Sequence, residues 1–144
     1  NNNKNSVVIR TNIFGCKPGM LADWAIQSYK DNEKIDGYVN VKFNPVYVGD
    51  LAVAIRKTID HEVTGIINVA GDTCLSKYHF LKLLYKRFNM DTEMIRPKTY
   101  NDHGQELQRP KYTCLQTGLF EKEFDHIFSL DQGLDKLFEE YKEE

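Results

Sequence analysis

The sequence predicts an α/β fold in which parallel strands are joined by helices. Two runs rich in β-branched residues, 6–10 and 65–71, have the near-continuous apolar character of strands that are covered on both faces. Amphipathic helical patterns lie between these runs and after them. Strands that alternate with helices are typical of a parallel sheet with helical crossovers. We therefore expect an α/β domain.

The elements follow one another along a single domain of residues 6–144, after a polar start, 1–5, that is expected to be frayed. Each helix is predicted from apolar residues at helical spacing, and each strand from a short β-branched or extended run. The predicted elements are a strand over 6–10, a helix over 20–30, a strand over 39–43, a helix from Asp50, a strand over 65–71, a helix after Ser76, an extended piece over 94–97, a long irregular connection over 99–110 and a last helix from about Ser129.

Local signals mark where the helices begin. Asp50 places an acid in a first turn, where it complements the helix dipole. Ser76 can cap the next helix, and Ser129 with Gln132 forms a capping-box pattern. For the helix that Asp50 opens, the predicted inner face is Leu51, Ala54, Ile55, Thr58 and Ile59.

The composition is that of an ordinary globular protein. Hydrophobic residues make up 41% of the chain and aromatic residues 12%, which argues against disorder. No apolar run approaches the ~18 residues of a membrane span, and no basic start followed by an apolar stretch suggests a signal peptide. We expect a cytoplasmic protein that does not enter a membrane.

The charges are distributed unevenly. Residues 120–144 hold nine acids against three lysines, and the residues before them hold 16 basic against 12 acidic side chains. A weakly basic body suits a small anionic ligand better than a nucleic acid. The acidic end is interpreted as the solvated face of a helix.

The cysteines and histidines do not form a recognisable motif. Cys16, Cys74 and Cys114 are widely spaced, and no CxxC pair occurs, so that neither a zinc site nor a disulfide framework is predicted. The four histidines are equally scattered. The expectation is three reduced cysteines and no metal.

Two stretches carry candidate binding residues. Thr11 and Asn12 fall at the carboxyl end of the first strand, where α/β sheets bind ligands, although their spacing alone favours a turn in which Asn12 caps local backbone. Arg109 precedes Pro110 in an irregular segment. A guanidinium there suits a phosphate, and the alternative is a surface arginine that meets an acid.

Four stretches occur in the order and spacing of one family: RTNIFG at 10–15, FNPVYVGDLAVAI at 43–55, GIINVAGDTCLSKYHFLKLL at 65–84 and QRPKYTCL at 108–115. The chain resembles the C-terminal part of the extended short-chain dehydrogenases/reductases, in the dTDP-4-dehydrorhamnose reductase-like branch. The resemblance implies the C-terminal portion of a Rossmann-like fold, without the N-terminal cofactor-binding half.

The resemblance also implies a substrate site. It places Asn12, Phe14 and Gly15 against the sugar of a nucleotide sugar, and Arg109 at its diphosphate. Phe43 and Asn44 border the nucleotide in many relatives, although the arginine that some branches have there is missing. With Thr11, these are the predicted substrate-binding residues. Asp50 is expected to be structural.

The catalytic parts of such an enzyme are not found in this sequence. The glycine-rich NAD(P) motif is missing, and the Tyr-x-x-x-Lys pair of the family precedes the strand that opens this chain. Tyr38 with Lys42 and Tyr78 with Lys82 have that spacing and are interpreted as coincidences. We therefore expect a piece of a longer enzyme, in which an upstream half binds NAD(P)H, with no cofactor and no catalytic residue on this chain.

The leading hypothesis is the substrate-binding portion of an NAD(P)H-dependent reductase of nucleoside-diphosphate keto-sugars. An epimerase or dehydratase of the same superfamily is an alternative, since these enzymes share this half. A second class of function is a non-catalytic regulatory or binding subunit on the same scaffold. A free-standing domain would leave a sheet edge exposed and would be expected to form a homodimer or to swap strands.

Overall fold

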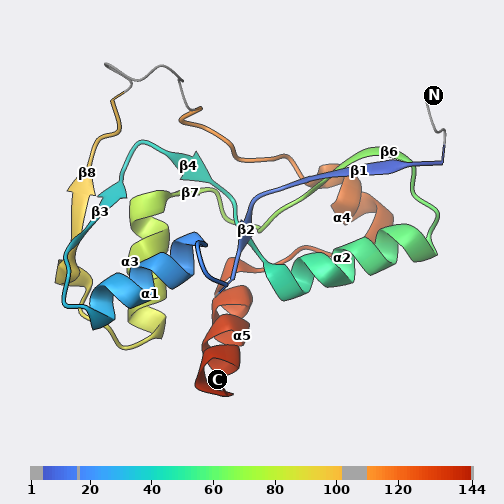
Figure 1. The fold of residues 1–144 in the computed structure, drawn as a ribbon. Helices are drawn as coiled ribbons and strands as arrows, with labels where there is room; N and C mark the ends of the chain where they lie inside the picture. The colour runs from blue at the N-terminus through green and yellow to red at the C-terminus, as the bar shows by residue number, and fades with distance from the viewer. Residues whose placement is uncertain (1–4, 16, 102–109, 144) are drawn as a thin grey trace.

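The computed structural model describes residues 5–15, 17–101 and 110–143, and it shows a mixed α/β fold with two hydrophobic cores. Figure 1 shows the two parts: an arm that contains β1 (Val7–Thr11), β6 (Gly65–Val69), α2 (Val48–Asp60) and α4 (Gly118–Phe124), and a body built around α1 (Leu21–Lys30) and α3 (Lys77–Arg87).

The arm is a parallel strand pair covered by helices. β1 and β6 align Val7 with Gly65 and Thr11 with Val69. Figure 1 shows α2 and α4 on the same side of this pair. Their contact with the strands encloses a small core that is centred on Ile67, Val69 and Phe120. Val8 and Ile66, which lie on the opposite face of the strands, are 54% and 60% exposed.

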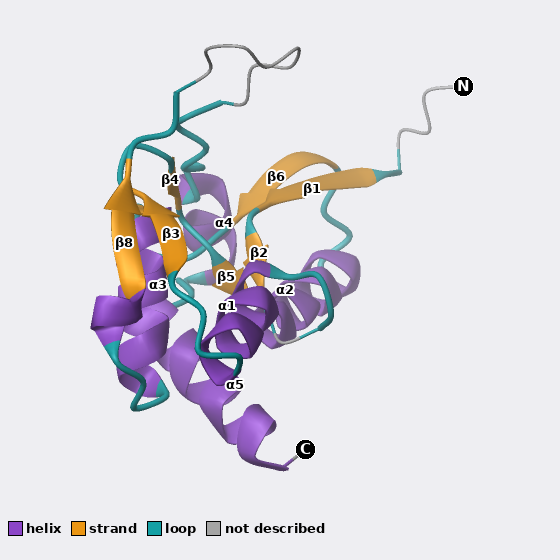
Figure 2. Ribbon diagram, turned by 60° about the vertical axis from the view of Figure 1, so that its left-hand side comes forward, coloured by secondary structure: helices purple, strands orange, loops and turns teal. Residues whose placement is uncertain are grey.

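The body contains a second parallel pair, β3 (Ile35–Tyr38) with β8 (Ile95–Lys98). Figure 2 shows these strands side by side, with α3 behind them. Gly37 permits the close contact with α3, because a Cβ at this position would lie 2.9 Å from the Cα of Tyr78. α1 also packs against α3, where the hydroxyl of the buried Tyr85 donates to the Ala25 carbonyl at 2.8 Å.

Short strands and the last helix complete the fold. β2 (Ile13–Phe14) pairs with β5 (Val46–Tyr47) in parallel, and β4 (Lys42–Phe43) pairs with β7 (Leu75–Ser76) in antiparallel orientation. The 3-10 helix η1 (Thr92–Met94) precedes β8. α5 (Leu130–Glu143) packs against β5 and α3.

The predicted helices and the two main strands are confirmed, with small shifts at their ends. Ser76 caps α3 as expected, since its hydroxyl accepts from the His79 N–H at 3.2 Å. The helix expected from Asp50 begins two residues earlier, at Val48. The strand expected over 39–43 is reduced to β4, and β3 precedes it.

Two expectations about side chains need correction. Ile55 and Ile59 do not belong to the inner face of α2: they are 41% and 63% exposed, whereas Ala54 and Thr58 are buried. The acidic end is not only a solvated face, because Asp131 and Asp135 of α5 both pair with Arg87 of α3. Helical periodicity shows that α2 has apolar residues at regular spacing, but not which of them pack against the core of this chain.

The expectation of reduced cysteines is wrong for two of the three. Cys74 and Cys114 form a disulfide, with their Cα atoms 5.8 Å apart although the residues are 40 positions apart in the sequence. A pair at this separation carries no local sequence signal. It forms because the fold brings the residue before β7 next to residues 110–116.

Candidate functional site

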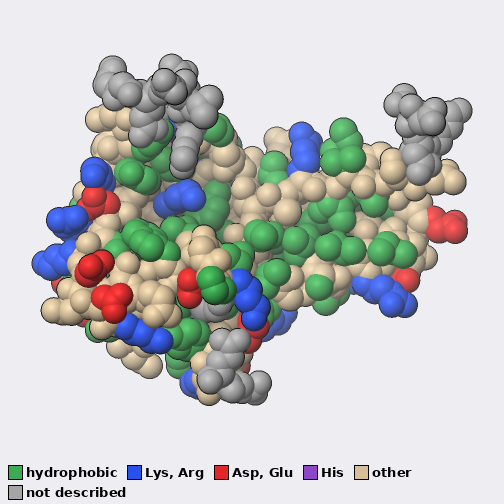
Figure 3. Space-filling model, in the orientation of Figure 1, with side chains coloured by type: hydrophobic (Ala, Val, Ile, Leu, Met, Phe, Trp, Pro, Cys, Tyr) green, Lys and Arg blue, Asp and Glu red, His purple; other side chains and the backbone are tan. Residues whose placement is uncertain are grey.

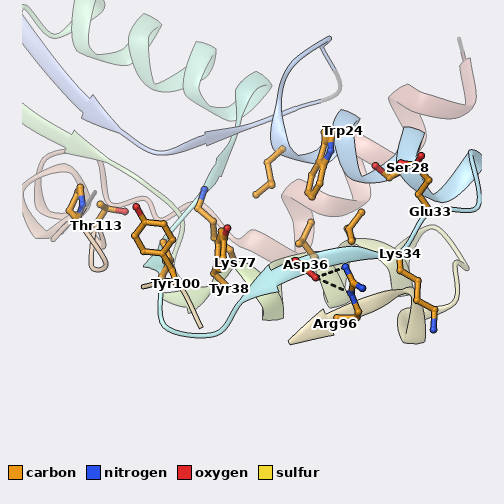
Figure 4. Close-up of a pocket in the computed structure, with 15 residues that line it drawn as sticks. Trp24, Ser28, Glu33, Lys34, Asp36, Tyr38, Lys77, Arg96, Tyr100 and Thr113 are labelled. Atoms are coloured by element: carbon orange, nitrogen blue, oxygen red, sulfur yellow. Dashed lines mark hydrogen bonds and ion pairs between the residues drawn. The ribbon is translucent and has the colours of Figure 1, made fainter. Parts of the chain in front are cut away.

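A pocket of about 680 Å³ opens in the body of the molecule, between α1, the β3–β8 pair and the start of α3. Figure 4 shows the lining side chains in two groups: Trp24, Ser28, Glu33, Lys34, Asp36 and Arg96 toward one end, and Tyr38, Lys77, Tyr100 and Thr113 toward the other. The pocket therefore draws its lining from segments that are far apart in the sequence.

The first end of the pocket combines an ion pair with an exposed indole. Asp36 of β3 accepts from Arg96 Nε at 2.9 Å and from Lys98 Nζ at 2.7 Å, both on the neighbouring strand β8. The hydrogen bond from Lys98, helped by Arg96, lowers the pKa of Asp36 below its ordinary value. One carboxylate thus faces two cations, and the strand pair keeps a net positive charge. Trp24 of α1, which is 44% exposed, lines the same end of the pocket.

The second end of the pocket combines aromatic rings with a lysine at a helix start. The rings of Tyr38 and Tyr100 meet edge to face at 5.3 Å. Lys77 is the first residue of α3, and its ammonium lies 5.0 Å from the centre of the Phe43 ring. A cation at the positive end of a helix favours an anionic group.

One wall of the pocket is an extended segment, residues 110–116, which we call the strap. Pro110 and Thr113 of the strap line the pocket. The strap runs beside β4: Lys42 N–H donates to the Lys111 carbonyl at 2.8 Å, and Thr113 N–H donates to the Lys42 carbonyl at 2.9 Å. Backbone pairing therefore fixes the strap at the pocket.

Asn12 and Asn44, two predicted binding residues, hold the strap from below. Asn12 Nδ2 donates to the Thr113 carbonyl at 2.8 Å, and it also contacts Asn44 Oδ1 at 3.3 Å. Asn44 Nδ2 donates to the Leu115 carbonyl at 2.8 Å. In this structure the two amides position a wall of the pocket and do not line it.

The other predicted site residues lie apart from the pocket. Phe14 is 1% exposed and packs against Phe80 in the body core, and Phe43 is 7% exposed beneath Lys77. The Oγ1 atom of Thr11 is buried and has no hydrogen-bond partner among the described residues. Arg109 lies outside the described residues, directly before the strap.

The two Tyr–Lys spacings have structural surroundings. Tyr78 packs over Gly37, and the Lys82 ammonium lies 5.6 Å from the centre of the Tyr78 ring while it pairs with Glu93 at 3.7 Å. Tyr38 lines the pocket, but Lys42 is in a different strand and is engaged through its backbone with the strap.

The residues that line the pocket were missed by the sequence reasoning, although signals for some existed. Predicting that β3 pairs with β8 requires long-range information. The acid in one short strand and the two bases at alternate positions of the other, Arg96 and Lys98, nevertheless suggest a cross-strand charge cluster. Within the described residues there is no group of three or more potential metal ligands, and no helix is long and apolar enough to cross a membrane.

The chain is similar in structure to solved enzymes that act on sugar nucleotides. A dTDP-4-dehydrorhamnose reductase from Bacillus anthracis, solved with NADP, matches with a TM-score of 0.84 and 26% identity over 93% of this chain and 48% of that protein. A dTDP-4-dehydrorhamnose reductase ortholog from Clostridium acetobutylicum matches with a TM-score of 0.83 and 19% identity, over 94% of this chain and 49% of that one.

A dTDP-glucose 4,6-dehydratase from Bacillus anthracis, solved with NAD, has the same fold, with a TM-score of 0.75 and 16% identity over 95% of this chain and 44% of that one. No curated protein sequence matches the chain at a significant level. The chain spans about half the length of the solved relatives.

The fold matches the C-terminal part of Rossmann-like reductases. The family assignment is direct: residues 1–143 match the RmlD substrate binding domain, and the chain belongs to that family. The resemblance on which the sequence analysis rests is thereby confirmed.

Proposed function

We propose that this chain binds a nucleoside-diphosphate sugar in the pocket, as the substrate-binding portion of an NAD(P)H-dependent reductase of nucleoside-diphosphate keto-sugars. The observation that carries the proposal is the lining of the pocket, where aromatic rings and cations from separate elements surround one cavity. The chain belongs to the RmlD substrate binding domain family, which fits such a ligand.

The chemistry of the lining fits the parts of such a ligand. Tyr38, Tyr100 and Trp24 offer flat surfaces to a base. Lys77, at the start of α3, offers a charge and a helix N-terminus to a diphosphate. Arg109, directly before the strap, would add the bidentate contact that its guanidinium permits. Asn12 and Asn44 act through the strap, which they hold in place.

The role of this chain in the reaction would be to position the substrate. Binding energy from a diphosphate that does not react can hold the keto carbon in place for reduction. NAD(P)H, bound by an upstream half, would supply the hydride. No residue of this chain is assigned a proton-transfer role, because Tyr78 packs on the backbone of Gly37 and Lys42 is engaged through its backbone with the strap.

The upstream half would dock on the arm. Val48, Ala52, Ile55 and Ile59 are exposed and fall within an arc of about 60° on α2, at 100° per residue. Figure 3 shows hydrophobic side chains spread over this part of the surface. The solved relatives are about twice as long as this chain, so a second half of similar size is available to cover this apolar face. Large exposed apolar surfaces of this kind usually mark an interaction site.

A test is a calorimetric titration of the chain with dTDP and with UDP, with NADPH as the control ligand. A diphosphate is expected to bind, and NADPH is not. Lys77→Ala and Arg109→Ala should each weaken binding by roughly 10- to 150-fold, as expected for a lost charge-assisted contact of about 1.5–3 kcal/mol. Lys122→Ala, on α4 of the arm, is the matched control and should bind like the wild type.

The complete gene product separates the reductase from its alternatives. Consumption of NADPH with a dTDP-4-keto-sugar supports the reductase. Turnover of a nucleotide sugar without net oxidation of NADPH would favour an epimerase or dehydratase, whose solved examples share the fold. Binding without turnover would favour a regulatory subunit.

A further inference from the structure

The disulfide of this chain lies close in sequence to residues that line the proposed substrate pocket. Cys74 directly precedes β7, and Cys114 is in the strap. Both cysteines flank β4, because Leu75 pairs with Phe43 on one side and Tyr112 bridges Lys42 on the other. The bond thus closes across β4 and joins two segments that are far apart in the sequence.

These two segments both carry residues that line the same end of the pocket (Figure 4). Lys77 follows Cys74 by three residues and Leu81 comes one turn later on α3, whereas Thr113 directly precedes Cys114. The strap is held by hydrogen bonds to Lys42, Asn12 and Asn44, all of which lie earlier in the chain. The disulfide is the covalent link between the strap and the segment that leads into α3. Its state therefore bears on how the strap and the start of α3 are spaced at this end of the pocket.

The bond is open to chemical attack. Cys74 is exposed and Cys114 is half-buried, and the Tyr112 hydroxyl lies 3.7 Å from the Cys74 sulfur. Exposed disulfides are the ones that exchange with thiols, whereas buried ones resist reduction. A thiolate arriving from solvent would reach Cys74 first.

We propose that Cys74 and Cys114 form a reversible thiol–disulfide site that sets the affinity of the pocket for its ligand, with the disulfide form as the tight-binding state. This inference rests on the proposed function for the identity of the ligand. A dithiol attacks the Cys74 sulfur and releases the Cys114 thiolate, and its second thiol then displaces Cys74. Two electrons and two protons pass to the protein, and the dithiol becomes a cyclic disulfide. A small-molecule disulfide such as oxidised glutathione reverses the reaction.

The experiment compares the oxidised chain with the chain reduced by dithiothreitol, using dTDP as the probe. Reduction is expected to raise the Kd by roughly tenfold, in the range of ordinary coupling between sites. A Cys74→Ser/Cys114→Ser variant should show the weaker affinity under both conditions, whereas Cys16→Ser should respond like the wild type. Bridging the two reduced thiols with dibromomaleimide should restore the tighter binding.

A second readout does not depend on the ligand. Without dTDP, hydrogen exchange in a peptide spanning residues 110–116 should become faster on reduction, and a peptide from α2 should not change. If the strap responds but dTDP binds to neither form, the proposed ligand is wrong and redox control of the pocket wall stands. Unchanged exchange, an equal Kd for both forms, three free thiols in the untreated chain, or loss of the helical circular dichroism signal on reduction would each overturn the inference. The last result would make the bond a requirement of the fold.

Discussion

The side chain of Asn44 binds both backbone groups of Leu115. Its Oδ1 accepts from the Leu115 N–H at 2.9 Å, and its Nδ2 donates to the Leu115 carbonyl at 2.8 Å. Asn44 is only 5% exposed, so that water cannot replace these bonds. A residue that family resemblance assigns to the substrate thus serves, in this structure, to hold the strap.

Replacement of Asn44 should therefore destabilise the protein. Asn44→Leu leaves the N–H and the carbonyl of Leu115 without their partner, and we expect the free energy of unfolding to fall by about 1–3 kcal/mol. Urea denaturation measures this change. Gln27→Ala, at an exposed position of α1, is the control and should change stability by less than about 0.5 kcal/mol. Equal midpoints for Asn44→Leu and the wild type would show that the strap is not held in this way.

Reduction of the disulfide should lower stability through the unfolded chain. The bond closes a loop between residues 40 positions apart. From the chain entropy of such a loop, we expect the free energy of unfolding to fall by about 4 kcal/mol when the bond is opened. Thermal unfolding with and without dithiothreitol measures the effect. Cys16→Ser keeps the pair and should retain the sensitivity to dithiothreitol. If the melting temperature does not depend on the reductant, the two cysteines are not joined in solution.

The exposed stripe of α2 should govern association with a cofactor-binding half. Ile59→Asp places a charge at a position that is 63% exposed in this chain but would be covered in the complete enzyme. We expect it to weaken association with a separately produced upstream half by at least roughly tenfold, because a charge would be buried without a partner. Val53→Asp, at an apolar position on another side of α2 that is 49% exposed, is the matched control.

Analytical ultracentrifugation or calorimetry of the mixed halves would report this difference. Both variants should keep the helical content and the dTDP affinity of the wild type, since neither position lines the pocket. An effect of equal size from Val53→Asp and Ile59→Asp would place the docking surface elsewhere.

Stability should fall at alkaline pH because of Tyr85. Burial, with a smaller effect of Tyr29, raises the pKa of Tyr85 from 10.0 to about 12. The folded state therefore keeps the phenol proton where the unfolded chain loses it. The protonated Tyr85 phenol contributes its full stabilisation of the folded state below pH 10, and this stabilisation is lost as the pH rises from 10 to about 12. The free energy of unfolding of the wild type should decline in this window, and that of Tyr85→Phe should decline less. Parallel curves for the two proteins would contradict the assignment.

Much of the local structure followed from the sequence. The apolar spacing of α1 and α3, the Ser76 cap and the β-branched runs of β1 and β6 are properties of short segments, and each was predicted to within a few residues. Four motifs in order also indicated the family, which residues 1–143 confirm.

The pocket was decided by the tertiary structure. Asp36 meets Lys98 only because β3 pairs with β8, and Thr113 lines the pocket only because the strap pairs with Lys42 of β4. The same is true of the bond between Cys74 and Cys114. Helix formation depends on neighbours three and four positions away, whereas these contacts join residues 40 to 71 positions apart in the chain, whose proximity no local pattern encodes.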